Sequence, residues 1–160
     1  MTLGLSLEAF TRLHVALSLV GIVSGLIVLF GLIGARRLPG WTALYLVTTI
    51  LTSVTGFGFP FDHLLPSHKV GIISLVVLAI TVVARYGLAM AGAWRVIYVI
   101  GAALALYLNC FVGVAQAFLK IPALTALAPN QTEAPFVIAQ LAVLALFIVL
   151  TVVAAKRFRG

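Results

Sequence analysis

The sequence has very little charge. Only 8% of its 160 residues are Asp, Glu, Lys or Arg, whereas a soluble domain carries about a quarter. Hydrophobic residues make up 64% of the chain, and the mean hydropathy is +1.28. This composition excludes an ordinary soluble domain and predicts a protein whose main partner is the lipid bilayer.

Acidic residues are the scarcest charged type, with three against ten Lys and Arg, so the formal net charge is +7. In a soluble protein this balance would indicate a nucleic-acid partner. Here the basic residues stand at the ends of apolar runs, as topology signals do. We therefore expect no nucleic-acid partner and interpret the basic residues as markers of membrane orientation.

Cysteine and catalytic motifs are also scarce. The single cysteine, Cys110, excludes an internal disulfide and a multi-cysteine metal site. The chain contains no P-loop, no GxSxG and no HExxH motif. None of its apolar runs holds the mid-membrane Asp or Glu that proton-coupled pumps use. These absences disfavour an enzyme and a coupled transporter.

Long apolar runs are abundant, and each is near or above the roughly 20 residues that a helix needs to cross a bilayer. They predict an all-α, integral membrane bundle of five transmembrane helices that forms a single domain over residues 1–160. The expected spans are 9–34, 41–59, 69–90, 94–118 and 134–155.

The distribution of basic residues predicts the orientation of this bundle. With five spans, seven Lys and Arg share one face and three share the other, which places the N-terminus outside and the C-terminus in the cytoplasm. All three acids then lie outside. The inner set is Arg36, Arg37, Arg85, Arg95, Lys156, Arg157 and Arg159, and the outer set is Arg12, Lys69 and Lys120.

His14 begins a stripe on the first span. His14, Ser18, Gly21 and Gly25 are spaced by four, three and four residues, which places them on one face of an α-helix. Gly21 and Gly25 form a GxxxG motif, which lets another helix approach closely. We therefore expect His14 to point into the bundle. There it either bonds a glutamine of another span or handles a ligand or a proton.

Three amide side chains add hydrogen-bonding capacity to the outer half of the spans. Asn109 and Gln116 lie in span four and Gln140 lies in span five, whereas the inner half is nearly all Leu, Val, Ile and Ala. These amides act either as polar contacts between helices or, with His14, as the ligand-binding wall of a cavity open to the outside.

Residues 55–71 form the most polar break in the chain and contain Asp62, His63 and His68. Ser67 is the predicted N-cap of span three, which places His68 in the first helical turn. The helix dipole there disfavours the imidazolium form, and a neutral imidazole is the form that binds a metal or haem iron. His14, His68, His63 and Asp62 are therefore an alternative metal or haem site, although their spacing matches no recognised metal motif. Otherwise the two loop histidines are solvated residues.

Two stretches of the sequence resemble small polytopic bacterial inner-membrane proteins of unknown function. They are residues 55–71 and residues 98–135, the latter containing Tyr-Leu-Asn-Cys-Phe-Val and Ala-Leu-Ala-Pro-Asn-Gln-Thr. The resemblance implies a bacterial inner-membrane location and brings no activity or cofactor with it. The order of His68, Lys69 and Gly71 at the head of a span is also similar to that in small bundles thought to hold haem.

Three functions follow as hypotheses. The first is a binding or accessory protein whose outer-half polar cavity holds a small hydrophobic ligand, or which docks on a larger membrane complex or a second copy of itself. The second is a redox protein with haem or a metal at His14 and His68. The third is a small-solute transporter, which would need a polar path through the inner half that the sequence does not contain.

Overall fold

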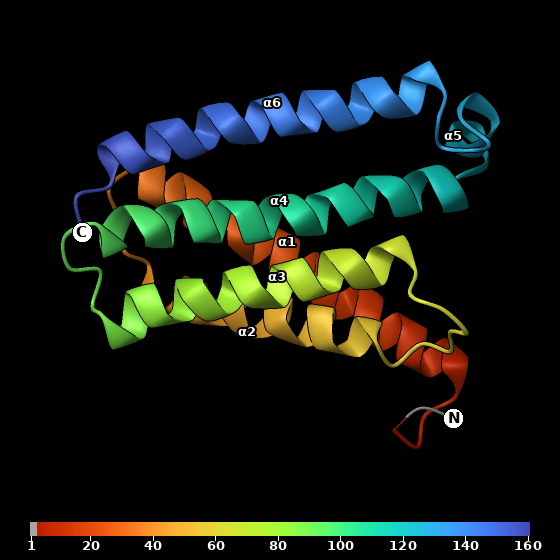
Figure 1. The fold of residues 1–160 in the computed structure, drawn as a ribbon, viewed down its shortest axis with the longest axis horizontal. Coiled ribbons are helices and arrows are strands. Elements are labelled where there is room, and N and C mark those ends of the chain that lie inside the picture. Colours follow the sequence, from red (N-terminus) through yellow and green to blue (C-terminus); the bar gives the residue numbers. More distant parts are fainter. Residues whose placement is uncertain (1–2) are drawn as a thin grey trace.

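A computed structural model describes residues 3–160, and within them the fold is all-helical with no β-strand. Within this range five long helices run up and down in a bundle (Figure 1). A π-helical turn, η1, continues α3, and a short helix, α5, precedes α6. The bounds are α1 Leu7–Ile33, α2 Pro39–Gly56, α3 Pro66–Val82, η1 Val83–Gly87, α4 Trp94–Lys120, α5 Pro122–Leu127 and α6 Ala134–Arg157.

Capping residues and prolines explain where these helices begin. The Ser6 side chain accepts a hydrogen bond from the Ala9 backbone amide at 3.2 Å and caps α1. Helices α2, α3, α5 and α6 each have a proline in their first two positions. Proline suits the first turn because its missing N–H would have no intrahelical partner there.

The predicted spans correspond closely to these helices. Helix α3 begins at Pro66 rather than at residue 69, and its N-cap is Leu65, so the prediction of Ser67 as the cap was wrong. Four helical segments are long and apolar enough to cross a membrane: α1, α3 with η1, α4 and α6. The chain thus has the helices of a multi-pass membrane protein. Helix α5 was not predicted, because its six residues are too few to form a recognisable periodic pattern.

Helix α2 differs from the other long helices. It has 18 residues and is not among the four membrane-crossing candidates. Its threonines lower its hydropathy, although several hydroxyls are satisfied within the helix. Thr48 donates to the Leu44 carbonyl at 2.7 Å, and Thr52 donates to the Thr48 carbonyl at 2.8 Å. The fifth span therefore stays a prediction.

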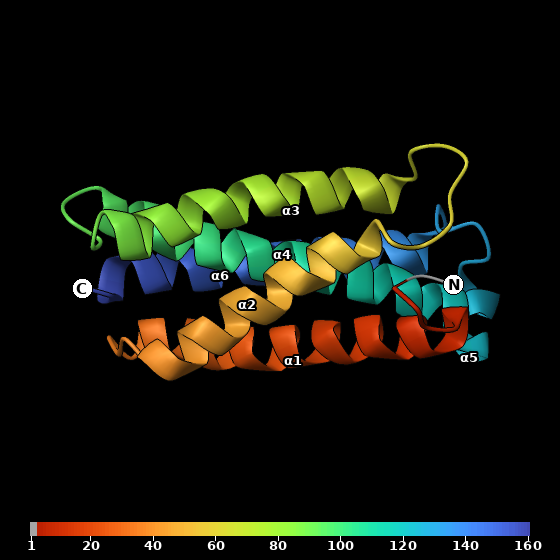
Figure 2. The same cartoon turned by 90° about the horizontal axis from the view of Figure 1, so that it is seen from below.

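The long helices alternate in direction, so the connections gather at two ends of the bundle. One end, which we call the N-side, carries the N-terminus, the α2–α3 loop and α5 (Figure 1). The other end, the C-side, carries the C-terminus and the α1–α2 and α3–α4 loops. Helices α1, α2, α3 and α4 pack in a ring, and α6 contacts α1 and α4. Helix α2 crosses α1 obliquely (Figure 2).

The C-side half of the ring is tightly packed. Tyr45 and Leu106 are buried against Gly25, where an added Cβ would lie 2.6 Å from Leu106 Cδ1. At Gly101 an added Cβ would overlap Thr81 Oγ1. Real Cβ atoms do not approach so closely, so glycine is needed for these helices to meet. The close approach predicted from the GxxxG motif is confirmed.

The C-side half also holds buried polar groups that the sequence analysis missed. Arg85 is only 8% exposed, and its guanidinium lies 5.0 Å from the Tyr98 ring centroid and donates to the Arg37 carbonyl at 3.4 Å. The Tyr45 hydroxyl donates to the Ala102 carbonyl at 2.7 Å. The expectation of a nearly featureless inner half was therefore wrong, because long side chains from the helix ends fold back into it.

Candidate ligand-binding cavity

A cavity of about 660 Å³ occupies the N-side half of the ring formed by α1, α2, α3 and α4. Apolar side chains from α1 and α4 form part of its wall, and hydroxyl groups from α2 and α3 form another part. His14, Asn109 and Gln116, which were predicted as ligand-binding residues, all line it. So does His68, from the first turn of α3.

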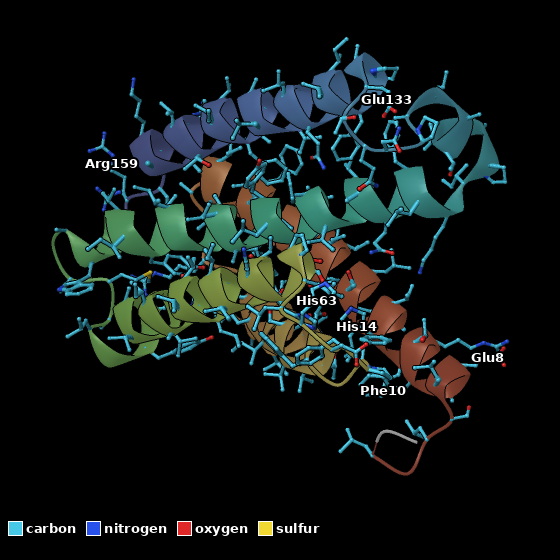
Figure 3. All side chains as sticks on the ribbon, turned by 45° about the vertical axis from the view of Figure 1, so that its right-hand side comes forward. Glu8, Phe10, His14, His63, Glu133 and Arg159 are labelled. Carbon is cyan, nitrogen blue, oxygen red and sulfur yellow. The ribbon has the colours of Figure 1, made fainter. Side chains whose placement is uncertain are left out.

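His14 projects from α1 toward the end of α2, whereas Glu8 points away from the bundle (Figure 3). The His14 Nδ1 atom lies 2.8 Å from Thr55 Oγ1. We assign the single Thr55 hydroxyl proton to the Leu51 carbonyl, the shorter of its two carbonyl contacts at 2.7 Å, and with this assignment Thr55 accepts from His14. Nδ1 therefore carries the proton, and in the neutral ring Nε2 keeps a free lone pair.

His68 has the opposite arrangement. Its Nδ1 accepts the Leu65 backbone N–H at 3.0 Å, so this nitrogen is unprotonated and Nε2 carries the proton. The Phe57 and Phe61 rings pack against the imidazole, with centroids 5.4 and 4.1 Å away. The side chain is only 4% exposed. The predicted first-turn position of His68 agrees with this geometry.

Deeper in the cavity, polar groups pair across helices. Ser18 donates to Asn109 Oδ1 at 2.9 Å, and Ser53 donates to Ser74 Oγ at 3.2 Å. Thr49 also lines the cavity and is 1% exposed, yet its hydroxyl has no hydrogen-bond partner within residues 3–160. A buried hydroxyl without a partner is costly, and this one is enclosed by protein atoms beside Gly21 rather than open to the cavity.

Gln140 lies elsewhere. Its Nε2 donates to the Phe111 carbonyl at 3.1 Å, which places the side chain between α6 and α4. The structure thus brings His14, Asn109 and Gln116 to one cavity and leaves Gln140 in a helix contact. The prediction that His14 might bond a glutamine was also wrong, because its partner is Thr55.

The alternative metal or haem site is only partly assembled. His14 and His68 line the same cavity, but Asp62 and His63 are exposed in the α2–α3 loop. Within residues 3–160, no three His, Cys, Asp or Glu side chains come together as a metal site. A metal needs an unprotonated nitrogen, which His14 offers at Nε2. His68 does not fit, because its Nδ1 already caps α3 and its Nε2 is protonated.

The hydroxyl residues of α2 and α3 are the part of the site that the sequence analysis missed. Thr49, Thr52, Ser53 and Gly56 share one face of α2. Their spacing was the available signal. It was overlooked because Ser and Thr in a helix usually bond their own backbone carbonyls.

Comparison with known proteins found no matching family model, no similar curated protein and no similar solved structure. The resemblance to bacterial inner-membrane proteins therefore stays a prediction.

Proposed function

We propose that this chain is a bacterial inner-membrane protein that binds a small hydrophobic ligand in the N-side cavity. The observation that carries the proposal is a space of about 660 Å³ in an apolar bundle, lined by two histidines and by hydroxyl-bearing residues of α2 and α3. Ligand pockets commonly have volumes of about 300–1,000 Å³ and combine apolar walls with a few polar groups.

The proposed topology has five spans, with the N-side outside and the C-side in the cytoplasm. The three acids belong to N-side segments and seven of the Lys and Arg belong to C-side segments, which is the asymmetry of the positive-inside rule. Helix α2 is the fifth span in this proposal. Threonine hydroxyls of α2 donate hydrogen bonds to backbone carbonyls of the same helix, which makes such a crossing tolerable in lipid.

Binding fits the structure better than transport does. A transporter needs a polar path to both sides of the membrane. Below the cavity, Tyr45, Tyr98 and Leu106 are fully buried and fill the ring. These side chains therefore close the ring between the cavity and the C-side end. The internal polar groups also favour a bound ligand over docking on a larger complex, because a docking partner would contact the exterior of the bundle.

A cavity-filling variant tests this function. Gly113 lines the cavity, and an added Cβ there would meet only Ile22 Cδ1, at 3.8 Å. Gly113→Leu should therefore occupy the ligand space without disturbing the backbone. Native mass spectrometry of the purified protein should show a co-purifying hydrophobic molecule on the wild type and none on Gly113→Leu.

Gly40→Leu is the matched control, since Gly40 lies in the first turn of α2 with open space at its Cβ. This variant should keep the bound molecule. Equal occupancy of wild type and Gly113→Leu would contradict the proposal, and so would loss of the molecule from both variants.

A further inference from the structure

The two cavity histidines have opposite hydrogen-bonding polarity. Because Nδ1 of His14 donates to Thr55, its Nε2 is an acceptor, and because Nδ1 of His68 accepts from Leu65, its Nε2–H is a donor. One group satisfies both only if it accepts and donates together. A hydroxyl does this, whereas a carbonyl or carboxylate only accepts and an ammonium only donates.

The charges around the cavity favour a neutral headgroup. Among the described residues that line it, no side chain is acidic, so a cationic ligand has no counter-ion there. A carboxylate or phosphate would direct its lone pairs at the lone pair of His14 Nε2. Lys120 is the one cationic side chain among the described residues of the lining, and it is exposed at the end of α4, where such attraction is weak.

Aromatic rings surround the same end of the cavity. Phe57 and Phe59 line it, and Phe59 packs edge-on against His14 with centroids 5.1 Å apart. Phe57 stacks on His68. Rings in this arrangement favour another ring as their neighbour. Apolar residues of α1 and α4 continue the wall and suit a hydrocarbon tail: Val15, Leu19, Ile22, Leu108 and Val112.

From these observations, and resting on the proposed function, we infer that the ligand is a neutral lipid with a phenolic headgroup of the quinol type. One hydroxyl donates to His14 Nε2 and accepts from His68 Nε2–H, while the ring lies against Phe57 and Phe59. The second hydroxyl of a para-quinol lies on the far side of the ring, toward the hydroxyl-bearing residues of α2 that line the cavity.

Binding of three matched probes to the purified wild-type protein tests this inference by calorimetry. The probes are 2-decyl-1,4-benzoquinol, its oxidised quinone and decanoate. The quinone cannot donate to His14, so it should bind about fivefold more weakly than the quinol, the loss expected for one neutral hydrogen bond. Decanoate should bind more weakly than both.

Two asparagine variants remove the two ligand contacts one at a time and keep the hydrogen bonds to Thr55 and Leu65. In His14→Asn the amide N–H still donates to Thr55, and in His68→Asn the amide oxygen still accepts from Leu65. His14→Asn should lower quinol affinity to that of the quinone and leave quinone affinity unchanged. His68→Asn should weaken both probes about fivefold. His63→Asn, in the exposed loop, is the control and should change neither.

Ring nitrogen NMR spectra of the wild type give a second readout that needs no variant. The quinol should shift His14 Nε2 as it gains a donor, and the quinone should not. Equal quinol and quinone affinity, or tighter binding of decanoate, would overturn the phenolic headgroup. The cavity would still stand as a binding site if Gly113→Leu abolished binding of the favoured probe. If Gly113→Leu bound every probe as the wild type does, the proposed function would fall as well.

Discussion

The N-side and C-side halves of the bundle are built from the same four helices but pack in different ways. Helix α4 shows the contrast on a single chain segment. Near its C-side end, Gly101 has no room for a Cβ beside Thr81, whereas Gly113 has open space beside Ile22. Both glycines stand among apolar residues of the same helix. The comparison teaches that in lipid the small residues and their register, not hydrophobicity, decide where helices close and where they leave a cavity.

Polar groups differ between the halves as well. In the C-side half they bond backbone carbonyls, as Tyr45 does with Ala102 and Arg85 with Arg37. Tyr98 is an exception, since its hydroxyl makes no hydrogen bond of normal geometry within residues 3–160, although Arg85 lies beside it. In the N-side half the histidines bond other residues through one nitrogen only. The polar groups of the C-side half therefore mostly bond within the protein, whereas some of those in the N-side half remain available to a ligand.

A pair of identical substitutions on α4 tests most sharply whether the two halves are packed differently. Gly101→Ala should destabilise the protein by about 3 kcal/mol, because the new methyl group overpacks against Thr81. Gly113→Ala should change stability by less than about 1 kcal/mol, with a gain in helix propensity offsetting any small loss. Thermal unfolding in detergent, followed by circular dichroism, measures both. Equal effects would show that the halves are packed alike.

A smaller effect is expected at Arg85. Arg85→Ala removes the contact with Tyr98 and the bond to the Arg37 carbonyl, and should cost about 2 kcal/mol. The exposed Arg36 is the control, and Arg36→Ala should change stability by less than about 0.5 kcal/mol. The same unfolding experiment compares them. Indistinguishable variants would mean that the buried guanidinium does not stabilise the C-side half.

The smallest effect concerns the loop before α6, at the N-side. Desolvation acts to raise the pKa of Glu133, but bonds from the Asn130 and Thr132 backbone amides and the Asn130 side chain lower it below the ordinary value of 4.5. The carboxylate's contribution to stability is therefore complete above that pH. It is lost as the pH falls through the lower folded-state pKa.

A carboxyl ¹³C NMR titration measures this midpoint directly. It should lie below 4.5 in the wild type and should rise in Asn130→Ala, which removes the Asn130 side-chain donor. Asn130→Ser keeps a hydrogen-bonding side chain and is the milder comparison. A wild-type midpoint at or above the ordinary value would show that the loop does not hold the carboxylate.

Much of the fold follows from the sequence for simple physical reasons. A long apolar run in lipid has to satisfy its backbone as a helix, and prolines start helices, so the five long helices were predictable. The π-helical turn at Val83–Gly87 was not predictable, because such a turn has no distinctive amino-acid composition. Nor was the burial of Arg85, because a long flexible side chain at a helix end can turn toward water or fold back.

The site was predictable in part. His14, Asn109 and Gln116 were identified because a polar side chain in lipid is costly unless it has a partner or a function. All three line the cavity. Gln140 satisfied the same criterion and lies between α4 and α6 instead. Sequence periodicity shows which face of a helix a residue occupies, but not which helix that face meets. The pairing of His14 with Thr55, and of Ser53 with Ser74, is therefore visible only in the packed structure.

The unequal helix lengths have a consequence for the membrane around the protein. Helices α1 and α4 have 27 residues each and extend about 40 Å at 1.5 Å per residue, against a hydrocarbon thickness of about 30 Å. Helix α2, with 18 residues, extends about 27 Å. If α2 crosses the membrane as proposed, the bilayer accommodates such mismatch by tilting the long helices and thinning beside the short one. The local thinning beside α2 would bring the lipid headgroups close to the mouth of the cavity.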